Sequence, residues 1–189
     1  MPKRAQSDNL NLVMTSPRGT QQVDATTAVC WCDFVPFIQA FLARCHTVVG
    51  AIAWLTHADL LGALGAVPNA RVVVTNDRFS QRSLAAYQAL TVRTLGKKRG
   101  RRRPLMHHKF LVGYDQAGQP VGTLLGSFNW SNHALVNLEH LVCLESPDLA
   151  AAFRAEFDRI WIHAKAIRIP RKKNPKKITC RKRKRNKSS

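Results

Sequence analysis

The apolar positions of this chain fall into short groups separated by polar residues, a pattern typical of alternating strands and helices. Continuous apolar runs at Thr47–Leu55 and Ala70–Thr75 predict strands that are buried on both faces. Apolar residues at three- and four-residue spacing over Phe34–Cys45 predict an amphipathic helix, with Asp33 as its N-cap. A shorter helix is expected over His57–Leu64.

The second half of the chain predicts a hairpin, another strand and a long helix. Leu105–Tyr114 and Pro120–Leu125 have strand character on either side of a turn-like segment, and Leu138–Glu145 is a further strand. Ser146 followed by Pro147 is a typical helix start. The apolar face of that helix is formed by Leu149, Phe153, Phe157, Ile160 and Trp161.

Two weaker elements, a strand over Asn11–Thr15 and a helix around Gln81–Leu90 capped by Asp77, complete the pattern. Strands that alternate with helices predict an α/β fold, a sandwich with one central mixed sheet and helices on both faces. We expect one domain over residues 10–168, since 189 residues are enough for one domain with a core and too few for two full ones. A flexible N-terminus over 1–9 and a disordered tail over 169–189 would flank it.

The charge narrows the choice of partners. With 189 residues and 45% apolar composition the chain is an ordinary globular protein, but its net charge of +19 and pI near 10.8 indicate a polyanionic partner. Nucleic acid is the commonest such partner, and an anionic membrane surface is the alternative. Residues 171–189 contain eleven Lys and Arg and no acid. A second basic run, expected to bind substrate at the rim of a groove, consists of Lys97, Lys98, Arg99, Arg101, Arg102 and Arg103.

Targeting and cysteine patterns predict an intracellular protein without stable membrane insertion. No apolar signal region follows the first basic residues, and no apolar run approaches the length needed to cross a bilayer. The prediction is a cytoplasmic protein if the host is a prokaryote or a phage, with a nuclear location as the alternative in a eukaryote or its virus. Cys30-x-Cys32 with Cys45-His46 could suggest a zinc site, but a whole predicted helix separates Cys32 from Cys45, whereas structural zinc sites prefer short paired spacings. We therefore interpret these cysteines as ordinary buried or free thiols.

Two short segments carry the candidate chemistry. His107 and Lys109 are two residues apart in a predicted strand, so their side chains should emerge on the same face. A histidine can attack phosphorus or transfer a proton near neutral pH, and a lysine can hold a phosphate by its charge. Ser127 and Asn129 follow a glycine turn and add a hydroxyl and an amide for phosphate oxygens.

These segments, with Asn137-x-Glu139, resemble the HKD signature of the phospholipase D superfamily. The sequence MHHKFLV…GSFNWS…NLEH is most similar to the single-motif members of that superfamily, which are the bacterial phospholipase D-like endonucleases and the mitochondrial phospholipase D (Zucchini) group. Each fragment alone is weak, but three in order are specific. The intervals on both sides of Asp115, the D of the motif, are longer than in the family, which indicates a longer hairpin tip.

The resemblance implies a metal-independent reaction through a covalent phosphohistidine, with no cofactor. His107 would be the nucleophile or the acid/base, Lys109 and Asn129 would hold the phosphate with help from Ser127, and Glu139 would orient the histidine. The family mechanism uses two histidines, so a chain with one motif is expected to form a homodimer that shares one active site.

The motif does not choose the phosphodiester, but the charge favours nucleic acid. We expect a non-specific endonuclease that acts on DNA, with RNA as a further substrate to test. The alternatives are a phospholipase D or cardiolipin hydrolase that acts on phospholipid, and a nucleic-acid-binding family member that has lost catalysis.

Overall fold

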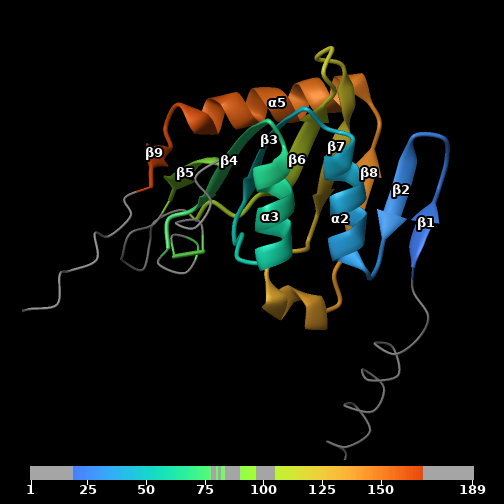
Figure 1. Ribbon diagram of the computed structural model, residues 1–189, viewed down its shortest axis with the longest axis horizontal. Coiled ribbons are helices and arrows are strands. Elements are labelled where there is room, and N and C mark those ends of the chain that lie inside the picture. Colours follow the sequence, from blue (N-terminus) through green and yellow to red (C-terminus); the bar gives the residue numbers. More distant parts are fainter. Residues whose placement is uncertain (1–18, 78–79, 81, 84–89, 97–104, 168–189) are drawn as a thin grey trace, which may run out of the picture.

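The computed structural model describes residues 19–77, 80, 82–83, 90–96 and 105–167 (Figure 1). The strands within these residues form one sheet in the order β1-β2-β8-β7-β6-β3-β4-β5-β9. The strands are β1 Thr20–Gln22, β2 Thr27–Cys30, β3 Thr47–Ile52, β4 Asn69–Thr75, β5 Thr91–Leu95, β6 Lys109–Tyr114, β7 Pro120–Gly126, β8 Leu141–Leu144 and β9 Lys165–Ala166. The helices are α2 Phe34–Ala43, α3 Ala58–Ala66 and α5 Pro147–Trp161, with a 3-10 turn η1 at Asn132–Val136.

The sheet is mixed, as the sequence predicts. β3, β4 and β5 run parallel to one another, while the remaining neighbours pair antiparallel. The parallel pair β3–β4 needs a crossover connection, and α3 supplies it. β6 lies between β3 and β7 near the middle of the sheet. The residues that precede β6 therefore lie at the end of the central strands.

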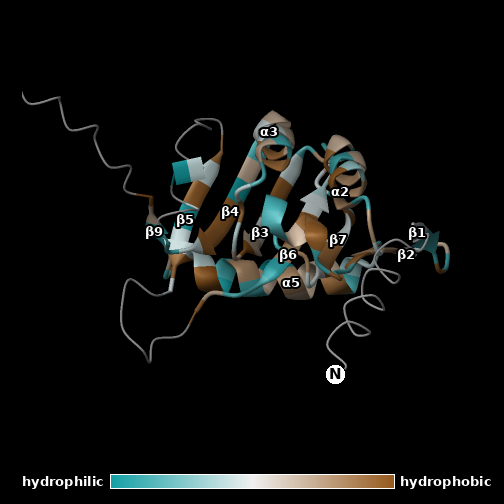
Figure 2. Ribbon diagram, turned by 90° about the horizontal axis from the view of Figure 1, so that it is seen from below, coloured by the Kyte–Doolittle hydropathy of each residue, from teal (hydrophilic) through white to brown (hydrophobic). Residues whose placement is uncertain are grey.

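Helices cover both faces of the sheet, with α2 and α3 on one side and α5 on the other (Figure 2). Alternate residues of β3 separate between these layers: Val48 and Ile52 join the core beneath α2 and α3. Val49 and Ala51 join the core beneath α5, which contains Phe157 and Ile160. Both faces of the central strands are therefore apolar, as expected for a sheet covered on both sides. This confirms the α/β sandwich predicted from the sequence.

The helix starts were predicted with mixed success. Ser146 caps α5 as expected, since its side chain accepts a hydrogen bond from the amide of Leu149 at 3.3 Å. Asp77 also accepts from the amide of Ser80, at 2.9 Å, where Ser80, Arg82 and Ser83 are helical. The expected cap at Asp33 is wrong. Its backbone is left-handed (φ 54°) and its side chain makes no capping bond, because a cap oxygen reaches the helix amides from an extended backbone.

Four strands were missed by the sequence prediction: β1, β2, β5 and β9. β1 is exposed throughout, β5 has polar residues between its apolar ones, and β9 has only two residues, so none carries a strong apolar pattern. Most of the predicted helix at Gln81–Leu90 and the predicted strand at Asn11–Thr15 lie outside the described residues.

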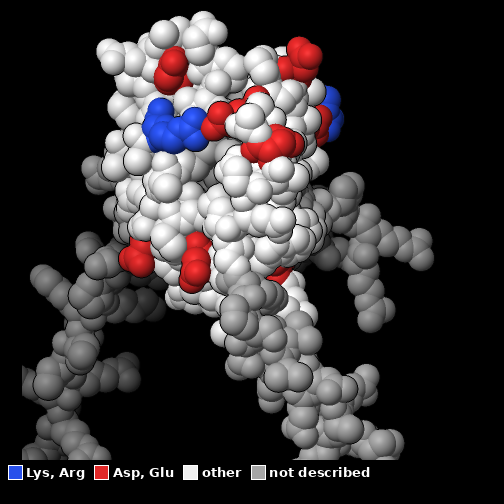
Figure 3. Space-filling view, turned by 90° about the vertical axis from the view of Figure 1, so that its right-hand side faces the viewer, with Lys and Arg blue, Asp and Glu red and all other residues white. Residues whose placement is uncertain are grey.

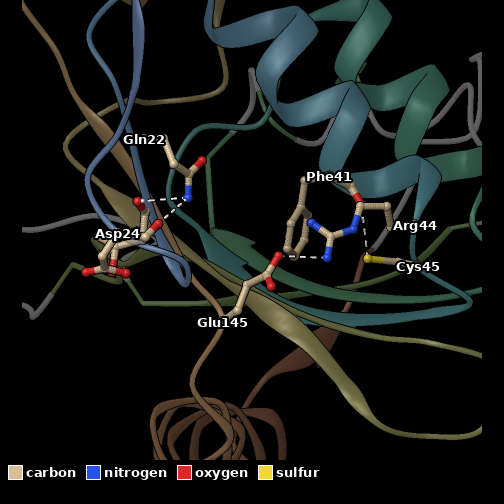
Figure 4. A network of polar contacts seen from close by, with 7 residues as sticks. Gln22, Asp24, Phe41, Arg44, Cys45 and Glu145 are labelled. Carbon is tan, nitrogen blue, oxygen red and sulfur yellow. Dashed lines mark hydrogen bonds and ion pairs between the residues drawn. The ribbon is translucent and has the colours of Figure 1, made fainter.

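A polar network joins the end of α2 to the loop between β8 and α5 (Figure 4). The Arg44 guanidinium lies 2.7 Å from a carboxylate oxygen of Glu145, and the Cys45 thiol donates to the Phe41 carbonyl at 3.3 Å. Both charged side chains are about half exposed, so this ion pair contributes at most about 1 kcal/mol. This ion pair joins two elements at the rim of the sandwich, at a place that is far from the predicted catalytic residues.

Candidate active site

The backbone around His107 is held at both sides by hydrogen bonds to neighbouring strand ends. The Thr75 hydroxyl, at the end of β4, donates to the Met106 carbonyl at 2.6 Å. The Ala53 amide, just after β3, donates to the His108 carbonyl at 2.8 Å. The prediction that a strand already includes His107 is wrong: β6 begins at Lys109, because its partner β3 ends opposite that residue at Ile52. The fixed carbonyls on either side still hold His107 in place.

His107 and Lys109 do lie together, as the motif predicts. The ammonium nitrogen of Lys109 lies 3.3 Å from Nδ1 and 3.3 Å from Nε2 of His107, and it also donates to the His107 carbonyl at 3.2 Å. Both ring nitrogens are within reach of one cation, so a neutral ring accepts from it at one nitrogen at a time. The imidazole of His107 and the ammonium of Lys109 thus lie side by side at the start of the central strand β6.

Desolvation and neighbouring charges favour the neutral form of the His107 imidazole. Partial desolvation, followed by the positive charges of Lys109 and His108, lowers the pKa of His107 below its ordinary value. Desolvation also lowers the pKa of Lys109, and the nearby carboxylate of Glu139 opposes that effect. A neutral histidine has a free ring nitrogen, so these shifts suit a nucleophile or a general base.

Ser127 and Glu139 form a second unit where β7 and β8 separate. The Ser127 hydroxyl donates a short hydrogen bond to Glu139 Oε2 and accepts one from the amide of His140 at 3.1 Å. The backbone amide of Ser127 donates to the His140 carbonyl at 3.1 Å, and the Asn137 amide group reaches Glu139 Oε1 at 3.3 Å. The described hydrogen bonds of Glu139 thus go to Ser127 and Asn137, not to His107.

Asn129 lies on a rigid support. The next residue, Trp130, is buried in the core, and its carbonyl accepts from the amides of Thr56 and His57 at 2.8 and 2.9 Å. The side-chain oxygen of Asn129 is buried and has no hydrogen-bond partner among the described residues. Buried polar atoms without a partner cost stability, and in native proteins they call for a specific explanation such as a catalytic role.

An open hollow of about 430 Å³ brings most of these groups to one surface. Its lining consists of His107, His108, Lys109, Phe110, Leu125, Gly126, Ser127, His140 and Phe153. Glu139 adjoins it through Ser127, whereas Asn129 is not among the lining residues. The predicted substrate-binding residues Lys97, Lys98, Arg99, Arg101, Arg102 and Arg103 lie outside the described residues.

A larger cavity of about 680 Å³ shares His107 and His108 with this hollow. Its walls are largely apolar, and its lining consists of Leu95, Gly96, Leu105, Met106, His107, His108, Arg159 and Ile160. Whatever is bonded to a phosphate at His107 therefore has an apolar recess beside it.

Two neighbours of the site were not predicted from the sequence. The Trp54 indole lies edge-to-face with the His107 ring, with the ring centres 5.1 Å apart, and its own N–H donates to Asp77 at 2.8 Å. His140 lines the hollow. No local sequence signal marks Trp54, because it lies at the end of an apolar run far from the motif. His108 packs against α5 as predicted, with its ring 3.2 Å from Glu156, although it also lines the hollow.

Asp115 lies in the hairpin turn, remote from the site. Its amide donates to the Gln119 carbonyl at 2.9 Å, and its carboxylate accepts from the Gln119 amide at 2.8 Å. A register shift between Gly113 and Tyr114 makes the end of the hairpin irregular. The predicted hairpin is thus observed, and Asp115 stabilises its turn; that it is longer than in the family stays a prediction.

The cysteines are mostly part of the core. Cys30 and Cys45 are buried, and desolvation raises the pKa of the Cys45 thiol to about 12 and that of Cys143 to about 11. In the described part of the chain, no three His, Cys, Asp or Glu side chains are grouped as metal ligands. Nor does any helix there have the length and apolar composition that crossing a membrane requires.

Together, the mixed sandwich and the His107–Lys109 site define a phosphodiester hydrolase of the phospholipase D type. The chain belongs to the phospholipase D-like domain family, since the model of the cardiolipin synthase, PLD-like domain matches residues 45–161. That match contains the whole motif and more than half of the chain.

Solved structures agree on the fold. NucT from Helicobacter pylori superimposes with a TM-score of 0.62 at 18% identity, covering 74% of this chain and 98% of that one. Nuc from Salmonella typhimurium, a phospholipase D family member, gives a TM-score of 0.59 at 20% identity, covering 76% and 98%.

Two relatives extend the comparison to sequence. An uncharacterized protein of Acanthamoeba polyphaga mimivirus is 21% identical over 82% of this chain and 72% of its own length. A mitochondrial cardiolipin hydrolase of Chlamydomonas reinhardtii is 35% identical over 88 residues, which are 45% of this chain and 31% of the relative.

Proposed function

We propose that this phosphodiesterase is a metal-independent nuclease that cleaves nucleic acid, DNA in particular, at internal positions and without sequence preference. The observation that carries the proposal is the contact between His107 and Lys109 beside the Ser127–Glu139 pair, in a chain of net charge +19. These four side chains supply phosphoryl-transfer chemistry, and the net positive charge supplies affinity for a polyphosphate.

In this mechanism a ring nitrogen of His107 attacks phosphorus and forms a P–N bond as one P–O ester bond breaks. The departing oxygen takes a proton from an acid. Water, giving up its proton to a base, then attacks phosphorus, breaks the P–N bond and restores the histidine. Division into two displacements lowers the barrier. Lys109 stabilises the charge on the non-bridging oxygens, with the amide group of Asn129 as a second donor. Ser127 assists by turning its hydroxyl from Glu139 to the phosphate when the substrate binds.

A second copy of the chain is proposed to supply the acid, because one motif contributes one such histidine. Exposed apolar side chains next to the site support a self-association surface: Trp31, Leu135, Val136 and Leu138. The Trp31 ring lies 6.3 Å from that of His140, and Trp31 and Leu135 line a pocket with Asn137, which binds Glu139. A two-fold axis through this region would bring two His107 side chains to one phosphate.

Cardiolipin hydrolysis is the second candidate. It is favoured by the name of the Chlamydomonas relative, although the match spans only 31% of that protein, and by the apolar cavity beside His107, which suits part of a lipid. The net charge of +19 weighs toward nucleic acid, since neutralising many backbone phosphates releases counterions. The third candidate is a nucleic-acid-binding protein that has lost catalysis. Against it stands the presence of every central residue of the motif: His107, Lys109, Ser127 and Glu139.

The test incubates wild type, His107→Ala and His163→Ala with labelled single-stranded DNA, plasmid, RNA and cardiolipin vesicles, all in EDTA. His163 is a matched control, because it is an exposed histidine after α5 that lines neither the hollow nor the larger cavity. We expect wild type and His163→Ala to cut DNA and His107→Ala to be inactive. Phosphatidic acid release without DNA cleavage would instead establish the lipid hydrolase. Salt-sensitive DNA binding without any turnover would establish the inactive binder.

A mixing experiment tests the shared site. After subunit exchange, an equal mixture of wild type and His107→Ala should retain about a quarter of the activity, because only wild-type pairs have two histidines. A chain that works alone would retain about half.

A further inference from the structure

Trp54 is the aromatic side chain that borders His107, and it comes from a different part of the sequence. It follows β3, whereas His107 precedes β6, and the two segments meet because Ile52 pairs with Lys109 and the Ala53 amide binds the His108 carbonyl. The indole and imidazole rings meet at 78° with their centres 5.1 Å apart. The Lys109 ammonium lies 6.0 Å from the centre of the indole.

The indole itself is fixed from its far side. Its N–H donates to a carboxylate oxygen of Asp77 at 2.8 Å, and the other oxygen of Asp77 accepts from the Ser80 amide at 2.9 Å. Trp54 is also partly buried against the core beneath α5. A ring held by a charge-assisted hydrogen bond and by packing has little freedom to rotate.

We propose that Trp54 is a positioning residue that fixes the plane of the His107 imidazole beside Lys109, so that one ring nitrogen points at the phosphate. The inference rests on the proposed catalytic role of His107. His107 is exposed at the protein surface, and its described side-chain hydrogen-bond contact is with Lys109, itself a long flexible side chain. A rigid aromatic wall restricts the imidazole more than that contact alone, because a flat face excludes alternative rotamers and water.

The charged groups around this corner define what a pH measurement would report. His108 and Lys109 adjoin His107 in the chain, Glu139 acts on Lys109, Asp77 lies behind the indole, and Arg159 lines the same cavity across from His107. Removal of the indole changes none of these charges but admits water to the imidazole. Without the indole, the His107 ring is therefore less desolvated, which favours its protonated form and raises its pKa.

The first arm of the test does not depend on activity. In protein labelled at the histidine side chains, NMR titration follows His107 in wild type, Trp54→Leu, Trp54→Phe and Trp161→Phe. Trp161 is the matched control, since it is a tryptophan partly buried against the same core as Trp54, and its ring packs on Phe157 and Arg93 instead of His107. We expect the midpoint of His107 to rise and its ring to become more mobile in Trp54→Leu, with a smaller change in Trp54→Phe and none in Trp161→Phe. An unchanged His107 in Trp54→Leu would overturn the proposal.

The second arm separates positioning from substrate binding. Trp54→Leu should lower kcat by about ten- to a hundred-fold while KM stays within about two-fold, because misplacement of a reacting group slows the chemical step. A raised KM with unchanged kcat would overturn the proposal and make Trp54 a surface for a base or a lipid. Trp54→Phe keeps an aromatic wall without the bond to Asp77, so it serves if Trp54→Leu fails to fold. If wild type cleaves no nucleic acid, the proposed function fails, and the titration still decides the role of Trp54.

Discussion

The protonation state of His107 decides what the site can do. The ring must be neutral to attack phosphorus, and desolvation and two neighbouring cations lower its pKa below the ordinary value. Below that lowered pKa the ring is protonated and inactive as a nucleophile, and above it the ring is neutral. Lys109 must keep its proton, so its own lowered pKa brings the alkaline loss of activity closer to neutral pH. Activity should therefore rise with pH as the attacking His107 loses its proton, and fall again as the acid histidine supplied by the second copy, and at higher pH Lys109, lose theirs.

Replacement of Lys109 by methionine tests this coupling. The substitution removes a positive charge beside the imidazole, so the pKa of His107 should rise, and turnover should fall by about a hundred- to a thousand-fold as phosphate stabilisation is lost. NMR titration gives the first quantity and initial rates give the second. Arg159→Met is the control, because it removes a cation from the same cavity without touching the imidazole. A His107 midpoint that stays the same or falls in Lys109→Met would contradict the account.

Thr75 supports the residue before His107. Its buried hydroxyl donates to the Met106 carbonyl at 2.6 Å, so Thr75→Val would keep the shape and leave a buried acceptor unpaired. The free energy of unfolding in urea should fall by about 1–3 kcal/mol. Thr94→Val is a suitable comparison, since its hydroxyl makes a longer bond, 3.4 Å, to Lys165; an equal or larger loss there would argue against a special role for Thr75.

At the scale of elements, the sequence predicted what apolar patterning controls. β3, β4, β6, β7 and α5 have long apolar runs or stripes, and all are present. Each of these strands has one end shifted from its predicted position, whereas α5 begins at Pro147 as predicted. The edge strands β1 and β9 are stabilised by backbone pairing with little apolar burial, so a pattern of side chains could not reveal them.

The residues of the candidate site likewise divide into those that the sequence could reveal and those that it could not. His107, Lys109, Ser127 and Glu139 could be found from the residues because their chemistry is local to a motif. Trp54 could not, since its place beside His107 depends on the register of β3 against β6. A contact created by strand pairing has no counterpart in the spacing of residues along the chain.

Gly126 tests the junction between β7 and β8. A β-carbon there would collide with the backbone carbonyl of His140, which cannot move away without breaking the pairing that carries Ser127 to Glu139. Gly126→Ala should therefore lower the free energy of unfolding by about 1–3 kcal/mol and reduce activity. Gly62→Ala in α3 is the control, because its β-carbon would meet nothing within 4 Å and should be neutral or stabilising. Equal stability of the two variants would show that β7 and β8 can separate freely.

At the scale of the whole molecule, most of the positive charge belongs to residues outside those that the structure describes. The described residues contain eight Lys and Arg against ten Asp and Glu, a net charge of about −2, although the chain carries +19. Figure 3 shows the face at the β1–β2 edge, where carboxylates outnumber cations. The excess cations belong to segments outside the described residues, chiefly the run at 97–103 and residues 171–189. We infer that these segments provide affinity for the polyanion, while the described residues provide the chemistry.

Deletion of residues 171–189 tests that division, because the segment contains eleven Lys and Arg and no acid. In the His107→Ala background, which prevents cleavage, the affinity for duplex DNA should fall, and the slope of log Kd against log salt should decrease by up to roughly ten if every cation meets a phosphate. Fluorescence anisotropy across a salt series measures both. A full-length variant with those cations changed to Gln separates charge from length. In the active protein, kcat at saturating DNA should be retained, since no described residue of the hollow changes. A salt slope that survives the deletion would place the binding charge in the run at 97–103, and a lost kcat would mean that the tail takes part in the chemical step.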